Sequence, residues 1–161
     1  MLRKWHEGHN KGMEFRAFIK NGKLFGLSQK DDTASYDFLL NEALKATIFG
    51  KVNDFIATKG LPGYRAAWLE LYVQPCDETF VFDLYVDIAP KHRVFLQDVS
   101  PWIEQTSSSL FEWDELNVDS VNEPEFRTLS ADSTMRRPKN YDIRFPVELN
   151  NMAELQRIID N

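Results

Sequence analysis

The stretch FVFDLYVDIAPKHRVFLQDVS, residues 80–100, contains two apolar runs separated by a short polar segment. Residues 80–88 and 94–100 are rich in β-branched and aromatic side chains, which favours strands. The segment between them contains Pro90, whose ring pre-sets the backbone for a turn. The stretch therefore predicts an antiparallel hairpin whose centre lies between Pro90 and Lys91.

This hairpin places two carboxylates directly opposite each other. Counting outward from its centre gives three cross-strand pairs: Asp83 with Asp98, Val81 with Ser100, and Tyr85 with Leu96. Because residues i and i+2 of a strand share a face, Asp83, Asp98 and Ser100 are expected on one face of the hairpin. A register slip of one residue would separate them.

Two opposed carboxylates need something that offsets their repulsion. Their Cβ atoms would lie about 5 Å apart, where like charges destabilise the pair. Mg²⁺ typically binds one or two protein carboxylates together with waters and phosphate oxygens. The pair therefore indicates a metal–phosphate site. The alternative is that Asp83 is an ordinary solvent-facing strand residue and that Asp98 simply ends its strand.

A second hairpin is predicted by MEFRAFIKNGKLFGLSQ, residues 13–29, where Asn21-Gly22 separates two apolar runs. This dipeptide favours a type I′ turn because both residues accept positive φ. The expected pairs are Arg16 with Leu27 and Glu14 with Gln29. A guanidinium can grip phosphate oxygens through two hydrogen bonds. Arg16 is therefore a candidate phosphate ligand, with an ordinary surface salt bridge as the alternative.

A helix is predicted over residues 35–59, because apolar residues recur at every fourth position. These residues are Leu40, Leu44, Ile48, Val52 and Ile56. Gly60 and Pro62 are expected to end this helix.

Three further elements complete the expected fold. They are a strand over residues 68–73, a short helix over 107–116 capped by one of its serines, and a terminal helix near 152–159. The chain is expected to form a single domain, residues 1–161, of the α+β class, with an antiparallel sheet of hairpins backed by helices.

Composition narrows the class of protein. The net charge is −6 and no stripe of Lys and Arg is present, which argues against nucleic-acid binding. A basic or neutral protein partner, or an anionic ligand held through a metal, fits this balance better. Cys76 is the only cysteine, which indicates a reducing compartment. No apolar run approaches the ~20 residues that span a bilayer, and the first residues lack the apolar core of a signal peptide. A cytoplasmic protein is expected.

Several segments, taken in order, resemble one known family. They are LRKW (2–5), GMEFRAFIKNGKLFGLSQKD (12–31), FVFDLYV (80–86), FLQDVSPWIEQTSSSLFEWDEL (95–116), EPEFR (123–127) and RFP (144–146). Their order and type are similar to the cell division cycle protein 123 family, whose members have an ATP-grasp fold. The resemblance runs from Leu2 to Pro146 and is poorer between Gly60 and Thr79.

The resemblance implies the C-terminal lobe of an ATP-grasp protein and an ATP–Mg²⁺ site. Its adenine would lie against a hinge at Arg3, Lys4 and Trp5, and Arg16 would face the phosphates. Asp83 and Asp98 would be the metal aspartates. Ser100 stands where the family has a metal-binding Asn, and a hydroxyl is a poorer ligand for a hard cation. The resemblance also implies that the family's N-terminal lobe is missing.

Three functions follow from these expectations. The first is an ATP-binding assembly chaperone for the gamma subunit of translation initiation factor 2, as the resemblance implies. The second is an ATP-grasp ligase, which needs phosphate-positioning groups from both lobes. The third is a degenerate binding or scaffold domain without nucleotide. A non-enzymatic chaperone is favoured over a ligase, because no acceptor site is evident.

Overall fold

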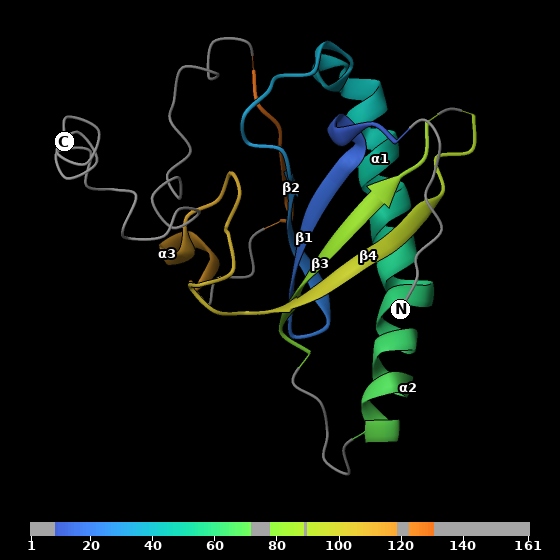
Figure 1. The fold of residues 1–161 in the computed structure, drawn as a ribbon, viewed down its shortest axis with the longest axis vertical. Coiled ribbons are helices and arrows are strands. Elements are labelled where there is room, and N and C mark those ends of the chain that lie inside the picture. The colour runs from blue at the N-terminus through green and yellow to red at the C-terminus, as the bar shows by residue number, and fades with distance from the viewer. Residues whose placement is uncertain (1–8, 72–77, 89, 119–122, 131–161) are drawn as a thin grey trace, which may run out of the picture.

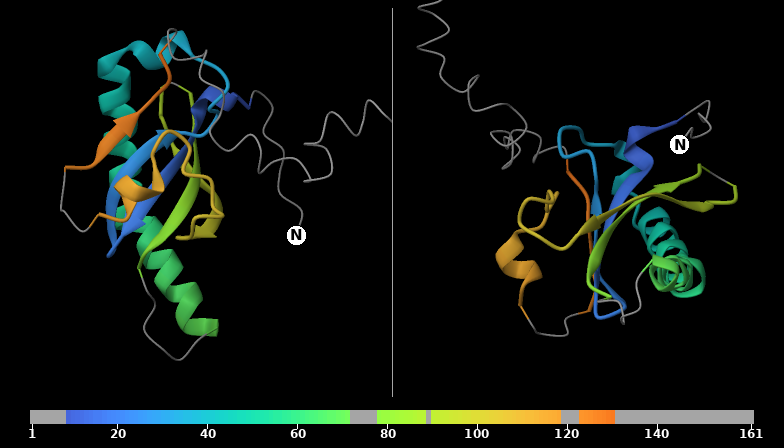
Figure 2. Two further views of the ribbon diagram at one scale, coloured as in Figure 1. Left: turned by 90° about the vertical axis from the view of Figure 1, so that its left-hand side faces the viewer. Right: turned by 60° about the horizontal axis from the view of Figure 1, so that its bottom comes forward.

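The computed structural model describes residues 9–71, 78–88, 90–118 and 123–130. Within these ranges the chain forms a five-stranded sheet with the strand order β4-β3-β1-β2-β5. Helices α1 and α2 form one long rod on one face of the sheet, and the short helix α3 lies on the other face (Figures 1 and 2). The mixed α and β class expected from the sequence is confirmed.

The strands follow the two predicted hairpins. They are β1 Glu14–Lys20, β2 Lys23–Gln29, β3 Phe80–Val86, β4 Val94–Pro101 and β5 Glu125–Arg127. β1 pairs antiparallel with both β2 and β3, and β3 pairs antiparallel with β4. The short strand β5 is the exception, since it runs parallel to β2.

The turn of the first hairpin forms as expected, but its register shifts along the strands. Asn21 and Gly22 both adopt positive φ, at 51° and 72°, as a type I′ turn requires. Beyond the turn, a bulge inserts Phe25 opposite the Phe18–Ile19 step. Arg16 therefore pairs with Ser28, and the predicted pairing with Leu27 is wrong. The predicted pair of Glu14 with Gln29 is wrong for the same reason, because Gln29 pairs with Phe15.

The second hairpin also contains a bulge, and here the bulge restores the predicted pairs. Asp83 pairs with Asp98, and Val81 pairs with Ser100, as the sequence predicted. Nearer the turn, Tyr85 pairs with Phe95 rather than with Leu96. Gln97 is the extra residue that shifts the register by one between these two regions.

The predicted helix continues well beyond its expected end. A 3-10 turn at Asp37–Leu40 precedes α1, Glu42–Phe55, and a π turn at Ile56–Gly60 leads directly into α2, Leu61–Leu71. Pro62 does not end the helix because it lies in the first turn of α2, where proline is tolerated. The strand predicted at 68–73 is therefore wrong for residues 68–71, and residues 72–73 lie outside the described ranges.

The start of the helix is fixed by Asn41, whose side chain accepts a hydrogen bond from the Leu44 N–H at 3.1 Å. Ile48, Val52 and Ile56 are buried beneath the sheet, as their spacing predicts. Leu40, at 48% exposed, lies outside this stripe because it belongs to the preceding 3-10 turn.

Two apolar cores pack on the two faces of the sheet. The larger core lies under α1 and includes Phe15, Ala17, Ile19, Leu27, Phe82 and Leu84. The smaller core contains Phe18, Val81, Phe111 and Leu116, with Phe25, Trp102 and Trp113 at its margin. β1 and β3 therefore contribute residues to both cores, as alternation along a strand predicts.

The short helix on the second face is shorter than predicted. α3 spans Trp113–Leu116, and its N-cap residue is Glu112 rather than a serine. The preceding serines do not join the helix because Ser109 has a φ of 52°, a left-handed conformation that interrupts helical geometry. The terminal helix predicted near 152–159 lies outside the described residues. In the part of the chain that the structure describes, no helix is both long and apolar enough to cross a bilayer.

Candidate functional site

The centre of the candidate site is an ion pair between adjacent strands. Arg16 of β1 lies directly opposite Asp83 of β3, on the face that carries α3. Its Nε donates to Oδ1 of Asp83 at 2.8 Å, and its Nη2 donates to Oδ2 at 2.9 Å. The side chains of Arg16 and Asp83 are 11% and 6% exposed. The site is therefore a nearly buried, two-point guanidinium–carboxylate pair.

Lys30 is a third member of this site, and the sequence did not predict it. Its Nζ lies 3.0 Å from Oδ2 of Asp83. Lys30 follows Ser28 by two residues, so the observed pairing of Ser28 with Arg16 indicates their common face. The predicted pairing of Arg16 with Leu27 concealed this relationship, because it assigned Lys30 to the opposite face.

The two cations determine the charge state of Asp83. Burial alone would raise the pKa of Asp83, but the hydrogen bonds and positive charges of Arg16 and Lys30 outweigh it and hold this pKa below its ordinary value. The carboxylate is therefore ionised near neutral pH. Two cations thus share one buried carboxylate.

Asp98 and Ser100 lie on the neighbouring edge strand β4. Asp98 pairs directly with Asp83 across the sheet and is exposed to solvent, while Ser100 is half-buried. Among the described residues, no hydrogen bond or ion pair involves the Asp98 carboxylate. The structure thus brings the two aspartates to adjacent positions, but only Asp83 is engaged by other side chains.

The site can be tested for its fit to a divalent cation. No group of three or more His, Cys, Asp or Glu side chains in the described ranges is arranged to hold a metal. Mg²⁺ does not require such a group, because waters and phosphate oxygens supply most of its ligands. The two carboxylates and the Ser100 hydroxyl fit Mg²⁺ in chemical type. Both oxygens of Asp83 already accept from Arg16 and Lys30, so metal binding requires Asp83 to exchange these partners.

Gln97, the bulged residue, adds a further polar atom to this part of the sheet. Its Nε2 donates to Oε1 of Glu14 at 3.1 Å, and His9 Nε2 contacts the same oxygen at 2.8 Å. Its own Oε1 is buried and has no hydrogen-bond partner in the described structure. Such an acceptor is of the chemical type that a cation or a ligand donor satisfies. The Glu14 carboxylate thus contacts both His9 and Gln97.

The predicted adenine hinge precedes the first described residue, His9. Arg3, Lys4 and Trp5 lie outside the described residues. The structure therefore brings together Arg16 and Asp83, places Asp98 opposite Asp83 and Ser100 farther along β4, and adds Lys30.

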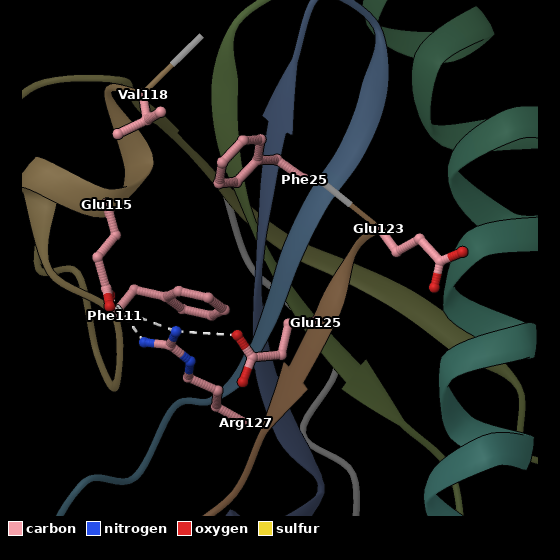
Figure 3. Close-up of a pocket in the computed structure, with 7 residues that line it drawn as sticks. All are labelled: Phe25, Phe111, Glu115, Val118, Glu123, Glu125 and Arg127. Atoms are coloured by element: carbon pink, nitrogen blue, oxygen red, sulfur yellow. Dashed lines mark hydrogen bonds and ion pairs between the residues drawn. The ribbon is translucent and has the colours of Figure 1, made fainter. Parts of the chain in front are cut away.

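A separate pocket of about 260 Å³ lies between α3 and the edge formed by β2 and β5 (Figure 3). It is lined by Phe25, Phe111, Glu115, Val118, Glu123, Glu125 and Arg127. Arg127 stacks on the Phe111 ring at 4.1 Å and pairs with Glu115 at 2.8 Å and Glu125 at 2.9 Å. None of the predicted site residues lines this pocket. Its arginine, Arg127, is already paired with two carboxylates of the pocket wall.

Comparisons with known proteins place the chain in a family. The family model described as D123 matches residues 1–153. A Xenopus tropicalis protein named translation initiation factor eIF2 assembly protein is 33% identical over 172 residues, which cover 99% of this chain and 47% of that protein. The cell division cycle protein 123 of Candida glabrata is 31% identical over 139 residues, covering 84% of this chain and 35% of that protein.

A solved structure is similar as well. C-terminally truncated Cdc123 from Schizosaccharomyces pombe shares 30% sequence identity with this chain and superposes with a TM-score of 0.54. The match covers 76% of this chain and 42% of that structure's chain. This chain thus spans less than half the length of the relatives named here. The resemblance to the cell division cycle protein 123 family is confirmed. Since the family model matches residues 1–153, nearly the whole length of this chain, the chain belongs to the D123 family.

Proposed function

We propose that this chain acts in the cytoplasm as an ATP–Mg²⁺-binding, non-enzymatic part of an eIF2 assembly factor, built as an ATP-grasp-like C-terminal lobe. Family membership supports the assembly role, since relatives from Xenopus tropicalis and Kluyveromyces lactis are named translation initiation factor eIF2 assembly protein. The chain spans less than half of the Xenopus relative, and we propose that this part contributes to the assembly role.

One observation carries the nucleotide-binding part of the proposal. Arg16 and Lys30 converge on Asp83, and Asp83 lies directly opposite Asp98. This arrangement offers two cations for phosphate oxygens beside two carboxylates for a hard cation. Phosphate would replace Asp83 as the partner of Arg16 and Lys30, and Asp83 would then be available to the metal.

Each expected site residue has a role in this proposal. Asp83, Asp98 and Ser100 would hold Mg²⁺, and Arg16 and Lys30 would hold phosphate oxygens. Arg3, Lys4 and Trp5 would contact adenine. Mg²⁺, when bound, would supply positive charge that offsets the negative charge of the carboxylates and the phosphate oxygens. The nucleotide serves in this role as a structural ligand.

The proposed partner is the gamma subunit of eIF2. The net charge of −6 suits a basic or neutral protein surface. Nothing in the ion-paired site requires nucleic acid, and the sequence shows no stripe of Lys and Arg. A direct protein contact is therefore the interaction to test.

The variant Asp98→Asn tests nucleotide binding without disturbing the fold. Asp98 is exposed and makes no ion pair within the described residues, so its neutralisation should leave the melting temperature unchanged. Isothermal titration calorimetry with ATP and Mg²⁺ should show binding by the wild-type chain and at least about tenfold weaker binding by the variant. Asp54→Asn on the exposed face of α1 is the matched control and should bind normally. No binding by the wild-type chain would contradict the proposal.

The assembly role needs its own test. The purified gamma subunit of eIF2 is mixed with the chain in the presence and absence of ATP–Mg²⁺, and the complex is measured by analytical ultracentrifugation. We expect direct binding that is stronger with nucleotide. A chain that takes up ATP but does not bind the gamma subunit would exclude the chaperone role.

A scaffold domain without nucleotide is the second candidate function. It is favoured by the fact that Arg16 and Lys30 already satisfy both oxygens of Asp83. In that case the site is a structural ion pair, and neither ATP nor Mg²⁺ alters the melting temperature. The calorimetry with Asp98→Asn distinguishes the two functions.

A further inference from the structure

The segment of residues 102–118, which includes α3, docks along one face of strand β1. Three alternate β1 residues contact it, because residues i, i+2 and i+4 of a strand share a face. Arg16 donates to the Ser107 carbonyl at 2.7 Å, and Phe18 packs against Phe111, Trp102 and Trp113. Lys20 donates to the carbonyl of Val118 at 2.9 Å. The segment and the candidate site are therefore built on the same strand face.

Arg16 contacts both the 102–118 segment and the candidate site. Its Nε and Nη2 face Asp83, while its Nη1 is bonded to the Ser107 carbonyl. The planar guanidinium moves as one unit, so the position of this carbonyl determines the direction of the two donors that face the site. Since the Arg16 side chain is only 11% exposed, water cannot easily replace the Ser107 carbonyl.

The position of Ser107 is itself fixed by its neighbour in the chain. The Thr106 hydroxyl donates to the Pro101 carbonyl at 2.8 Å. The Thr106 carbonyl accepts from the Trp113 indole N–H at 3.0 Å. On the other side, the Leu110 N–H donates to the Ser28 hydroxyl at 3.1 Å. These bonds connect the loop before α3 to the end of β4 and to β2.

We propose that the 102–118 segment regulates the nucleotide site, with the Ser107 carbonyl acting as a positioning group for Arg16. This inference rests on the proposed function, because it concerns the affinity of that same site. A change that loosens the segment weakens ATP binding, and ATP binding in turn alters the segment, since coupling between two sites is reciprocal. A protein that binds the segment would thereby change nucleotide affinity.

Thr106→Val tests the coupling at a residue that contacts neither Arg16 nor Asp83. Valine keeps the shape of threonine but removes the hydroxyl bond to Pro101. Thr58→Val is the matched control, because the Thr58 hydroxyl also donates to a backbone carbonyl, that of Asp54 at 2.6 Å, on the far side of the sheet. Thr106→Ser keeps the hydroxyl and serves as the rescue variant.

Calorimetry with ATP–Mg²⁺ is the first readout. We expect the dissociation constant to rise at least about fivefold in Thr106→Val, as for one lost hydrogen bond, and to stay at the wild-type value in Thr58→Val and Thr106→Ser. Equal affinities for all four proteins overturn the regulation but leave the proposed function intact. A wild-type chain that binds no ATP overturns both.

A nucleotide-free readout separates positioning from general stability. Asp83→Asn is combined with Thr106→Val and, separately, with Thr58→Val, and the denaturant midpoint of each double variant is compared with the sum of its single shifts. We expect non-additive shifts only for the pair that includes Thr106. Additive shifts in both pairs would show that Arg16 does not transmit changes between the segment and the site, and would overturn the inference.

Discussion

The guanidinium of Arg16 and the carboxylate of Asp83 meet through two hydrogen bonds, at 2.8 and 2.9 Å, between the central strand β1 and its neighbour β3. Both side chains are almost completely buried. A buried charge that loses its partner is far more costly than an exposed one, since water cannot solvate it. The pair is thus the centre of the candidate site, and the folded protein also depends on it for stability.

Neutralising Asp83 should therefore destabilise the fold. Asp83→Asn leaves Arg16 and Lys30 without their counter-charge, and we expect a loss of about 3 kcal/mol in the free energy of unfolding. Urea denaturation measures this loss. Asp98→Asn, on the directly opposite position of β4, should change the same quantity by less than about 0.5 kcal/mol. Equal stabilities of the two variants would contradict the burial and pairing described for Asp83.

Acid should act through the same carboxylate. The folded-state pKa of Asp83 is lowered, so its contribution to stability is fully present above the unfolded-state pKa of about 3.9 and is lost as pH falls through the lower folded-state pKa. We expect the stability difference between wild type and Asp83→Asn to be constant from pH 7 to about pH 5 and to shrink below about pH 4. Urea midpoints measured across this range test it, and a difference that grows on acidification would refute it.

The Tyr36 hydroxyl should ionise only at strongly alkaline pH. Burial and the hydrogen bond that its hydroxyl donates to Asp31, at 2.7 Å, raise the pKa of Tyr36 to about 12. Because this folded-state pKa is raised, the stabilisation is complete below the unfolded-state value of about 10 and is lost as pH rises through about 12. Ultraviolet titration should show a phenol that ionises near pH 12, and Tyr36→Phe should remove this step.

Two glycines should respond to alanine in opposite directions. A Cβ on Gly26 would lie 2.7 Å from the Phe111 ring, so Gly26→Ala displaces a ring of the smaller core and should cost about 1–3 kcal/mol. A Cβ on Gly50 in α1 meets nothing within 4 Å, and Gly50→Ala should stabilise by about 0.5–1 kcal/mol through helix propensity. Thermal denaturation of both variants checks the contrast, and it fails if Gly26→Ala melts at or above wild type.

The sequence predicted those parts of the fold that depend on local chemistry. Asn21-Gly22 specifies its turn through φ alone, and the spacing of Ile48, Val52 and Ile56 specifies the buried face of α1. The end of the helix was predicted wrongly because a π turn allows Pro62 to fall in a new first turn. The spacing of apolar residues and the positions of Gly and Pro do not show where a π turn replaces regular α-helical hydrogen bonding.

The candidate site was predictable only in part, for a related reason. Asp83 and Asp98 were expected opposite each other and are, but Lys30 was missed because a bulge shifts the first hairpin. The structural role of Gln29, outside the site, was missed as well. This residue is buried at the end of β2, and its amide bonds the backbones of Asp31, Ala34 and Leu129. A contact between residues 100 positions apart leaves no periodic trace in the sequence.

The bulge at Gln97 decides which face of the sheet Asp98 and Ser100 occupy. If β4 kept its length but lost the bulge, the register near the turn would continue along the strand and bring Asp98 opposite Phe82, on the side of α1. Deleting Gln97 itself removes the extra residue, so Asp98 would stay opposite Asp83 in an unbroken ladder. The polar face of the outer half of β4 should therefore tolerate the loss of this residue, whereas inserting one more residue beside it would require either a larger bulge or an exchange of the polar and apolar sides.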